Sequence, residues 1–163
     1  MTSDTEIRKR NELNTSPRCV LFVEENIDDF SLACYVLSQV KLHNKVIHVR
    51  SADEMLEYLR AMDEYLDRDK YPLPAVIVMD MRLPAATGME AQTMLRTNLR
   101  FRHIPIICIG ASESMEHLKA AVDLGADAWM LKPFSVAEFL KIVRDLKLPL
   151  QFETPSNKPA AVS

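Results

Sequence analysis

Four acidic residues lie within six positions of the stretch FVEENIDDF, which spans residues 22–30. They form two pairs, Glu24 with Glu25 and Asp28 with Asp29. The stretch follows a short apolar run and leads into a segment with helical periodicity. Carboxylates this close repel one another, so a folded protein keeps them together only where water, a helix N-terminus or a metal ion offsets their charge.

A further carboxylate and an amine follow two other apolar runs. Asp80 comes directly after AVIVM, and Lys132 comes directly after AWML. Five runs of strand length occur along the chain, at residues 19–23, 45–49, 75–79, 104–109 and 128–131. They are continuous rather than alternating in polarity, which predicts strands of a parallel sheet that is covered on both faces.

Amphipathic segments with helical spacing separate these runs. Ser51 and Ser135 are each followed three residues later by a glutamate, and this capping-box pattern predicts two helix starts. Asp28 or Asp29 is expected to cap the first helix, and Gly125 to end another in a left-handed conformation. Alternating strands and helices predict an α/β domain: a five-stranded parallel sheet with helices on both faces, in a doubly wound three-layer arrangement.

In such folds the functional site lies at the carboxyl ends of the strands. This rule brings Glu24, Glu25, Asp80 and Lys132 into one crevice. Two carboxylates about 4 Å apart repel by roughly 4 kcal/mol at an effective dielectric of 20. A hard cation with oxygen ligands relieves this repulsion, and Mg²⁺ suits a site with few carboxylates and several waters. We therefore expect an Mg²⁺ site at these strand ends.

Composition excludes several other classes of protein. The chain has 163 residues, 48% hydrophobic and 26% charged, with a net charge of −3, so we expect one ordinary globular domain that binds neither nucleic acid nor membrane. The polar start carries no signal-peptide core, and no apolar run is long enough to cross a membrane, so the expected compartment is the cytoplasm. Only three glycines occur, which excludes a glycine-rich phosphate loop. The three scattered cysteines indicate reduced thiols.

The ordered set of motifs resembles the receiver domain of two-component response regulators. The motifs are VEEN, then MDMRLP with Thr87-Gly88, then LKPF, and the resemblance runs from about Arg18 to Leu146. The long segment at residues 62–74 is similar to that of single-domain regulators paired with phytochrome-type sensor kinases. The resemblance implies a flavodoxin-like, CheY-like fold. It divides the chain into a polar extension (1–17), a receiver domain (18–147) and a flexible C-terminal tail (148–163).

The resemblance also implies a role for each site residue. Asp80 would accept a phosphoryl group, and Lys132 would pair with its carboxylate and then with the phosphoryl group. Glu25 and Asp80 would bind Mg²⁺ directly, Glu24 would bind it through a water, and the backbone carbonyl of Arg82 would be another ligand. The proline after Lys132 resembles the family proline that follows a cis bond. These roles suit phosphoryl transfer, which depends on positioning and charge neutralisation.

The sequence departs from the family pattern at the residues that would act as its switch. Gly110, followed by Ala111, occupies the position where the family usually has a Thr or Ser hydroxyl. Trp129, the only tryptophan, stands where the family usually has Tyr or Phe. A partly buried aromatic at an interface is as plausible for Trp129 as a switch role. Glu25 is also unusual, because aspartate is commoner there.

Three functions fit these residues to different degrees. The first is a phosphoacceptor, at most self-catalysing its own phosphorylation and dephosphorylation, that takes a phosphoryl group from a sensor histidine kinase or a phosphotransfer protein. Such a regulator would signal by contact with a downstream protein target, and a homodimer is also compatible with it. The second is a receiver-like interaction module that is not phosphorylated. The third, an aspartyl-phosphate hydrolase, ranks last because its DxD motif would follow the first strand, where this chain has EEN.

Overall fold

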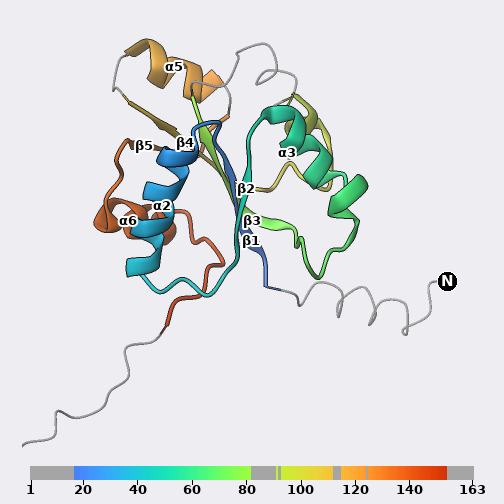
Figure 1. Cartoon of the computed structure of the whole chain (residues 1–163). Coiled ribbons are helices and arrows are strands. Elements are labelled where there is room, and N and C mark those ends of the chain that lie inside the picture. The colour runs from blue at the N-terminus through green and yellow to red at the C-terminus, as the bar shows by residue number, and fades with distance from the viewer. Residues whose placement is uncertain (1–16, 82–90, 92, 112–114, 124, 154–163) are drawn as a thin grey trace, which may run out of the picture.

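The computed structural model describes residues 17–81, 91, 93–111, 115–123 and 125–153 (Figure 1). Its centre is a five-stranded parallel sheet in the order β2-β1-β3-β4-β5. The strands are β1 (Cys19–Val23), β2 (Val46–Val49), β3 (Pro74–Asp80), β4 (Ile106–Gly110) and β5 (Ala128–Leu131). This order is that of flavodoxin-like folds, so the predicted α/β fold is confirmed.

Helices cover both faces of this sheet. They are α2 (Ile27–Gln39), α3 (Ala52–Leu59), the 3-10 helix η1 (Asp63–Leu66), α5 (Met115–Asp123) and α6 (Val136–Asp145), and residues 93–97 are helical as well. In Figure 1, α2 and α6 lie together on one side of the sheet and α3 lies on the other.

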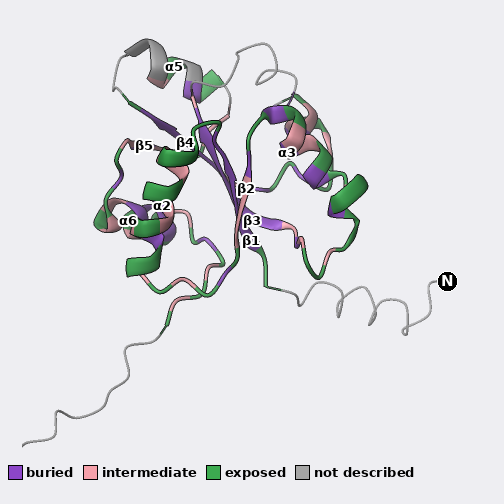
Figure 2. Cartoon of the chain, viewed as in Figure 1, coloured by how far each residue is buried: buried purple, intermediate pink, exposed green. Residues whose placement is uncertain are grey.

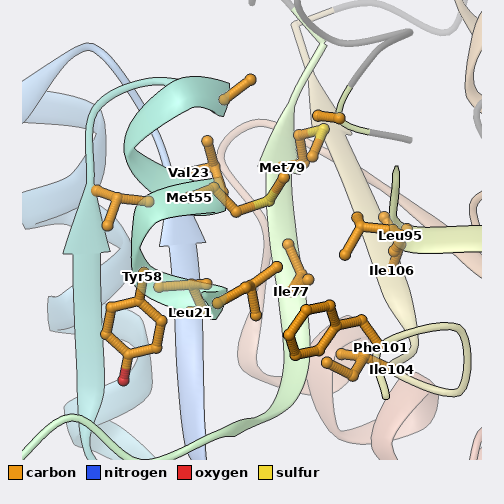
Figure 3. Close-up of a cluster of buried hydrophobic side chains, with 14 of the residues drawn as sticks. Leu21, Val23, Met55, Tyr58, Ile77, Met79, Leu95, Phe101, Ile104 and Ile106 are labelled. Carbon is orange, nitrogen blue, oxygen red and sulfur yellow. The ribbon is translucent and has the colours of Figure 1, made fainter. Parts of the chain in front are cut away.

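The continuous apolar strands contribute side chains to two separate hydrophobic cores, because alternate side chains point to opposite faces of the sheet. In β1, Leu21 and Val23 pack with α3, whereas Val20 and Phe22 pack with α2 and α6. The strands β1, β3 and β4 are buried along their whole length (Figure 2). Figure 3 shows the core on the α3 side, where side chains from β1, α3, β3 and the segment around Phe101 meet.

Most of the predicted helix ends are confirmed. The hydroxyl oxygens of Ser51 and Ser135 each accept a hydrogen bond from the backbone N–H three residues on, at 3.1 and 3.2 Å. Gly125 has a φ of +69°. The predicted cap of the first helix was wrong: the N-cap is Asn26, whose side-chain oxygen accepts from the N–H groups of Asp28 and Asp29. Asn is as good an N-cap as Asp, so residue type alone did not distinguish Asn26 from the two aspartates.

The segment after α6 differs from the flexible tail expected from residue 148 onward. Leu148 is buried, and Phe152 forms an antiparallel bridge with Leu42 in the loop between α2 and β2. The side chain of Asn44 in that loop joins the segment to the start of β1: its oxygen accepts from the N–H of Gln151 at 2.7 Å, and its amide nitrogen donates to the Arg18 carbonyl at 2.6 Å. Residues 148–153 therefore belong to the packed domain. Residues 154–163, like most of the predicted N-terminal extension, lie outside the described residues.

The cysteines Cys19, Cys34 and Cys108 are free thiols, as predicted. None of the helices in the described part of the chain is long and apolar enough to cross a membrane.

Candidate functional site

Three of the predicted site residues meet where β1, β3 and β5 end. Asp80 is the last residue of β3, Glu24 follows β1 directly, and Lys132 follows β5 directly. The Lys132 ammonium donates to Glu24 Oε2 at 2.7 Å and to Asp80 Oδ2 at 2.5 Å. The peptide bond between Lys132 and Pro133 is cis, as the family resemblance implied.

A third carboxylate, which the sequence analysis had assigned to helix capping, also binds Lys132. Asp29 lies in the first turn of α2, and its Oδ2 accepts from the Lys132 ammonium at 2.9 Å. The three acids differ in exposure: the side chains of Glu24 and Asp80 are each 2% exposed, whereas that of Asp29 is 33% exposed. Asp28 next to it is exposed. The only sequence signal for Asp29 was its place in a helical turn that follows a strand end.

Burial and neighbouring charges act in opposite directions on these groups. Burial and the neighbouring Asp80 raise the pKa of Glu24 above its usual range, while Lys132 and the Asn26 N–H act against this rise. Burial alone would lower the pKa of Lys132, but the three carboxylates outweigh it and the pKa is raised. Lys132 therefore stays charged and offsets carboxylates that would otherwise repel one another.

The loop that carries Glu24 is fixed by contacts that sequence reasoning missed. The Asn26 N–H donates to Glu24 Oε1 at 2.9 Å. His48 Nε2 lies 2.6 Å from the backbone oxygen of Glu24, and the ring of Phe30 stacks on the His48 ring with centroids 4.0 Å apart. The edge strand β2 thus holds the end of β1 and the start of α2 in place.

The other predicted metal ligands are placed differently. Glu25 is exposed, and the carboxylates whose oxygens lie within 4.8 Å of one another are those of Glu24, Asp29 and Asp80. A role of Glu25 in metal binding therefore stays a prediction. Arg82, with its predicted carbonyl ligand, lies outside the described residues, as do Thr87 and Gly88.

The predicted switch positions Gly110 and Trp129 form one packing unit. A Cβ atom on Gly110 would lie 2.6 Å from Cη2 and 3.0 Å from Cζ2 of the Trp129 indole. The indole ring therefore occupies the space that a side chain at position 110 would need. The indole Nε1 is buried without a hydrogen-bond partner among the described residues. Ala111, the third predicted switch residue, is exposed at the end of β4.

A pocket of about 280 Å³ is lined in part by Lys132. Asp29 and Lys132 give it a polar edge, and the remaining lining is apolar: Leu32, Ala33, Val36, Ile109, Ala111, Pro133 and Phe134. Asp29 and Lys132 therefore border the same pocket.

The donor set fits a hard divalent cation. Glu24, Asp29 and Asp80 each offer a carboxylate oxygen, and oxygen is the ligand atom that Mg²⁺ and Mn²⁺ prefer. With all groups ionised, the three carboxylates and the Lys132 ammonium carry a net charge of −2, from three negative charges and one positive charge. A divalent cation would balance this charge.

Comparison with known proteins decides the family. The model of the response regulator receiver domain matches residues 23–144. The chain belongs to the response regulator receiver domain family. Receiver domains are signalling domains of two-component systems. They bind a divalent metal and interact with histidine kinases or phosphotransfer partners.

Similar proteins include regulators associated with phytochromes. The chain is 30% identical to the bacteriophytochrome response regulator AtBRR, whose structure superposes with a TM-score of 0.70 over 87% of this chain and 99% of that one. Over 131 residues it is 26% identical to the probable methanogenesis regulatory protein FilR2 of Methanothrix harundinacea, covering 80% of this chain and 82% of FilR2. It is 23% identical over 131 residues to the response regulator Rcp1 of Synechocystis, covering 80% of this chain and 87% of Rcp1. A solved structure of Rcp1 is described as its Mn²⁺-bound form; it has a TM-score of 0.62 at 21% identity, covers 85% of this chain and 100% of that one, and supports the fold alone.

Proposed function

We propose that this receiver domain accepts a phosphoryl group on Asp80 and signals by contact with other proteins. The observation that carries the proposal is the hydrogen-bonded group of Asp80, Glu24 and Lys132 at the carboxyl ends of the strands. Asp80 is 2% exposed, a burial that a carboxylate tolerates only where charge partners compensate it. A purely structural acid at a strand end would be expected to face water instead.

In the proposed reaction, an Oδ atom of Asp80 attacks the phosphorus of the donor. The bond between phosphorus and the donor leaving group breaks, and the leaving group departs with the electron pair. An acyl phosphate is left on Asp80. Lys132 keeps the Asp80 carboxylate oriented before the attack and pairs with the phosphoryl oxygens afterwards, because its ammonium already lies at hydrogen-bond distance.

Glu24 and Asp80, with Asp29 beside them, would hold a divalent cation, Mg²⁺ under cellular conditions. When bound, the cation supplies positive charge that offsets the negative charge of the phosphoryl group. Glu25 and the carbonyl of Arg82 are further proposed ligands. The hydrogen bond from the Asn26 N–H to Glu24 Oε1, and that between His48 Nε2 and the Glu24 backbone oxygen, hold the Glu24 carboxylate at this position.

The proposed phosphodonors are a sensor histidine kinase or a phosphotransfer protein, and the similarity to AtBRR favours a phytochrome-type kinase. Output would pass to a downstream protein target or through a homodimer, since no part of this proposal requires catalysis on another substrate.

Intact-mass analysis after incubation with acetyl phosphate and Mg²⁺ tests the proposal. We expect one phosphoryl group per wild-type chain and none on Asp80→Asn. Adding EDTA should prevent the mass increase. If neither acetyl phosphate nor a phosphorylated phosphotransfer protein labels Asp80, the chain is a receiver-like interaction module that is not phosphorylated.

A further inference from the structure

The Lys132 ammonium has no hydrogen-bond donor to spare. An ammonium carries three N–H donors, and Lys132 directs them to Glu24, Asp29 and Asp80 at 2.7, 2.9 and 2.5 Å. A phosphoryl oxygen that arrives on Asp80 can therefore bind Lys132 only if one of these three bonds is given up.

The exposure of the three acids decides which bond is released most readily. Glu24 is 2% exposed, so losing Lys132 would leave its charge buried without this partner. Asp80 carries the phosphoryl group itself. Asp29 is 33% exposed and lines the pocket beside Lys132, so water can replace the ammonium at its carboxylate. Asp29 is therefore the least costly of the three to separate from Lys132.

We propose that Asp29 is a positioning residue that holds Lys132 in the unphosphorylated protein and yields it to the phosphoryl group. This inference rests on the proposed phosphorylation of Asp80. It assigns to Asp29 a restraining role: its carboxylate competes with the phosphoryl oxygens for one N–H of Lys132 and keeps the phosphorylation rate lower than the site would otherwise allow.

Removing the charge of Asp29 should have two effects of opposite sign. In Asp29→Asn a neutral amide replaces the carboxylate, so the phosphoryl oxygens meet a weaker competitor for Lys132. The net charge of the group also changes from −2 to −1, so a divalent cation should bind less tightly. A variant that merely disturbed the site would weaken both cation binding and phosphorylation.

Asp28 provides a matched control. It adjoins Asp29 in the same helical turn, its backbone N–H bonds to the same Asn26 oxygen, and Asp28→Asn makes the same change in net charge. Its side chain is exposed, and it forms no ion pair with the described residues. Any general effect of charge or of the helix N-terminus should therefore appear equally in both variants.

The experiment measures two quantities for wild type, Asp29→Asn and Asp28→Asn. Calorimetric titration with Mg²⁺ gives the cation affinity, and intact mass over time at saturating Mg²⁺ gives the rate of phosphorylation by acetyl phosphate. We expect Asp29→Asn to raise this rate by about three- to tenfold and to weaken Mg²⁺ binding by a similar factor. Asp28→Asn should leave both quantities within about twofold of wild type.

The possible results separate the inference from the proposed function. If wild type is phosphorylated but Asp29→Asn behaves as Asp28→Asn does, or is phosphorylated more slowly than wild type, the restraining role of Asp29 is refuted. If wild type takes no phosphoryl group, the proposed function fails. The hydrogen bond between Asp29 and Lys132 is then tested separately by ¹⁵N NMR, which measures the hydrogen-exchange rate of the Lys132 ammonium. Asp29→Asn should accelerate this exchange, and Asp28→Asn should not.

Discussion

Replacing Gly110 by alanine should displace Trp129, because the two residues share one space. The added Cβ would lie 2.6 Å from Cη2 of the indole, whereas carbon atoms in favourable contact are about 3.5–4.0 Å apart. The ring must therefore move by roughly 1 Å or rotate away. Overpacking of this kind costs about 1–3 kcal/mol. The backbone of Gly110 does not adopt a positive φ, so this cost arises from space alone.

Two measurements on Gly110→Ala test this reasoning. Urea unfolding should show a loss of about 1–3 kcal/mol in the free energy of unfolding. The emission of Trp129 reports on the ring directly, since the chain has no other tryptophan. A red shift of this emission is expected if the indole moves toward solvent. Together the two signals distinguish a displaced ring from a general loss of packing.

A second substitution decides whether the contact with Trp129 is the cause. Trp129→Phe removes the outer part of the ring and alone should cost about 1–2 kcal/mol through the space it leaves. Combined with Gly110→Ala, it should cost less than the sum of the single changes, with a coupling energy of about 1–2 kcal/mol. Additive effects, or a wild-type emission spectrum in Gly110→Ala, would show that the indole is not confined by Gly110.

Three other perturbations address the site and the packing around it. Glu24→Gln should stabilise the metal-free protein at neutral pH: the folded-state pKa of Glu24 is raised, so ionisation costs stability as pH rises through that pKa. The gain should vanish below the ordinary glutamate pKa of about 4.3, where Glu24 is protonated in both states, and melting curves at both pH values in EDTA check this. Asn44→Ala should cost about 1–3 kcal/mol and accelerate hydrogen exchange at the Gln151 amide, which donates to the Asn44 side chain. Arg68→Lys should lower the free energy of unfolding by about 1–2 kcal/mol in urea, since the Arg68 guanidinium donates to three backbone carbonyls at and after the end of α3.

The strands and the residues that follow them were predictable from sequence, because they depend on local patterns. An apolar run of four or five residues places its next residue at a strand end, and this rule located Glu24, Asp80 and Lys132 without any tertiary information. The order of the motifs along the chain then indicated the family. Helix starts at serine were equally local, since the capping hydrogen bond joins residues only three positions apart.

The role of Asp29 was not predictable in the same way. Asp28 and Asp29 are identical in type and adjacent, and successive helical residues differ in direction by about 100°. Which of them faces Lys132 depends on how α2 is rotated against the sheet, and that rotation is set by the packing of Ala33 and Leu37 in the core. Sequence could place both acids in the first turn but could not orient them.

The relation between Gly110 and Trp129 likewise depends on strand register. In sequence they are two separate departures from the family pattern, 19 positions apart (129 − 110 = 19). In the sheet, Gly110 pairs with Leu131, so Trp129 is its diagonal neighbour on the adjacent strand. The Trp129 indole occupies the space beside Gly110 that a larger side chain at position 110 would need. The glycine at position 110 and the tryptophan at position 129 are therefore parts of a single packing arrangement.

This arrangement changes which residues can respond when charge is added at Asp80. A glycine has no side chain to move toward a phosphoryl group, and the indole already fills the adjacent space. Of the described carboxylates that bind Lys132, that of Asp29 is the most exposed to solvent. Phosphorylation of Asp80 would add about one negative charge, which favours bringing Lys132 closer to Asp80 and weakening its contact with Asp29. A rearrangement at the start of α2, where Asp29 lies, is therefore the structural response that the resting site favours.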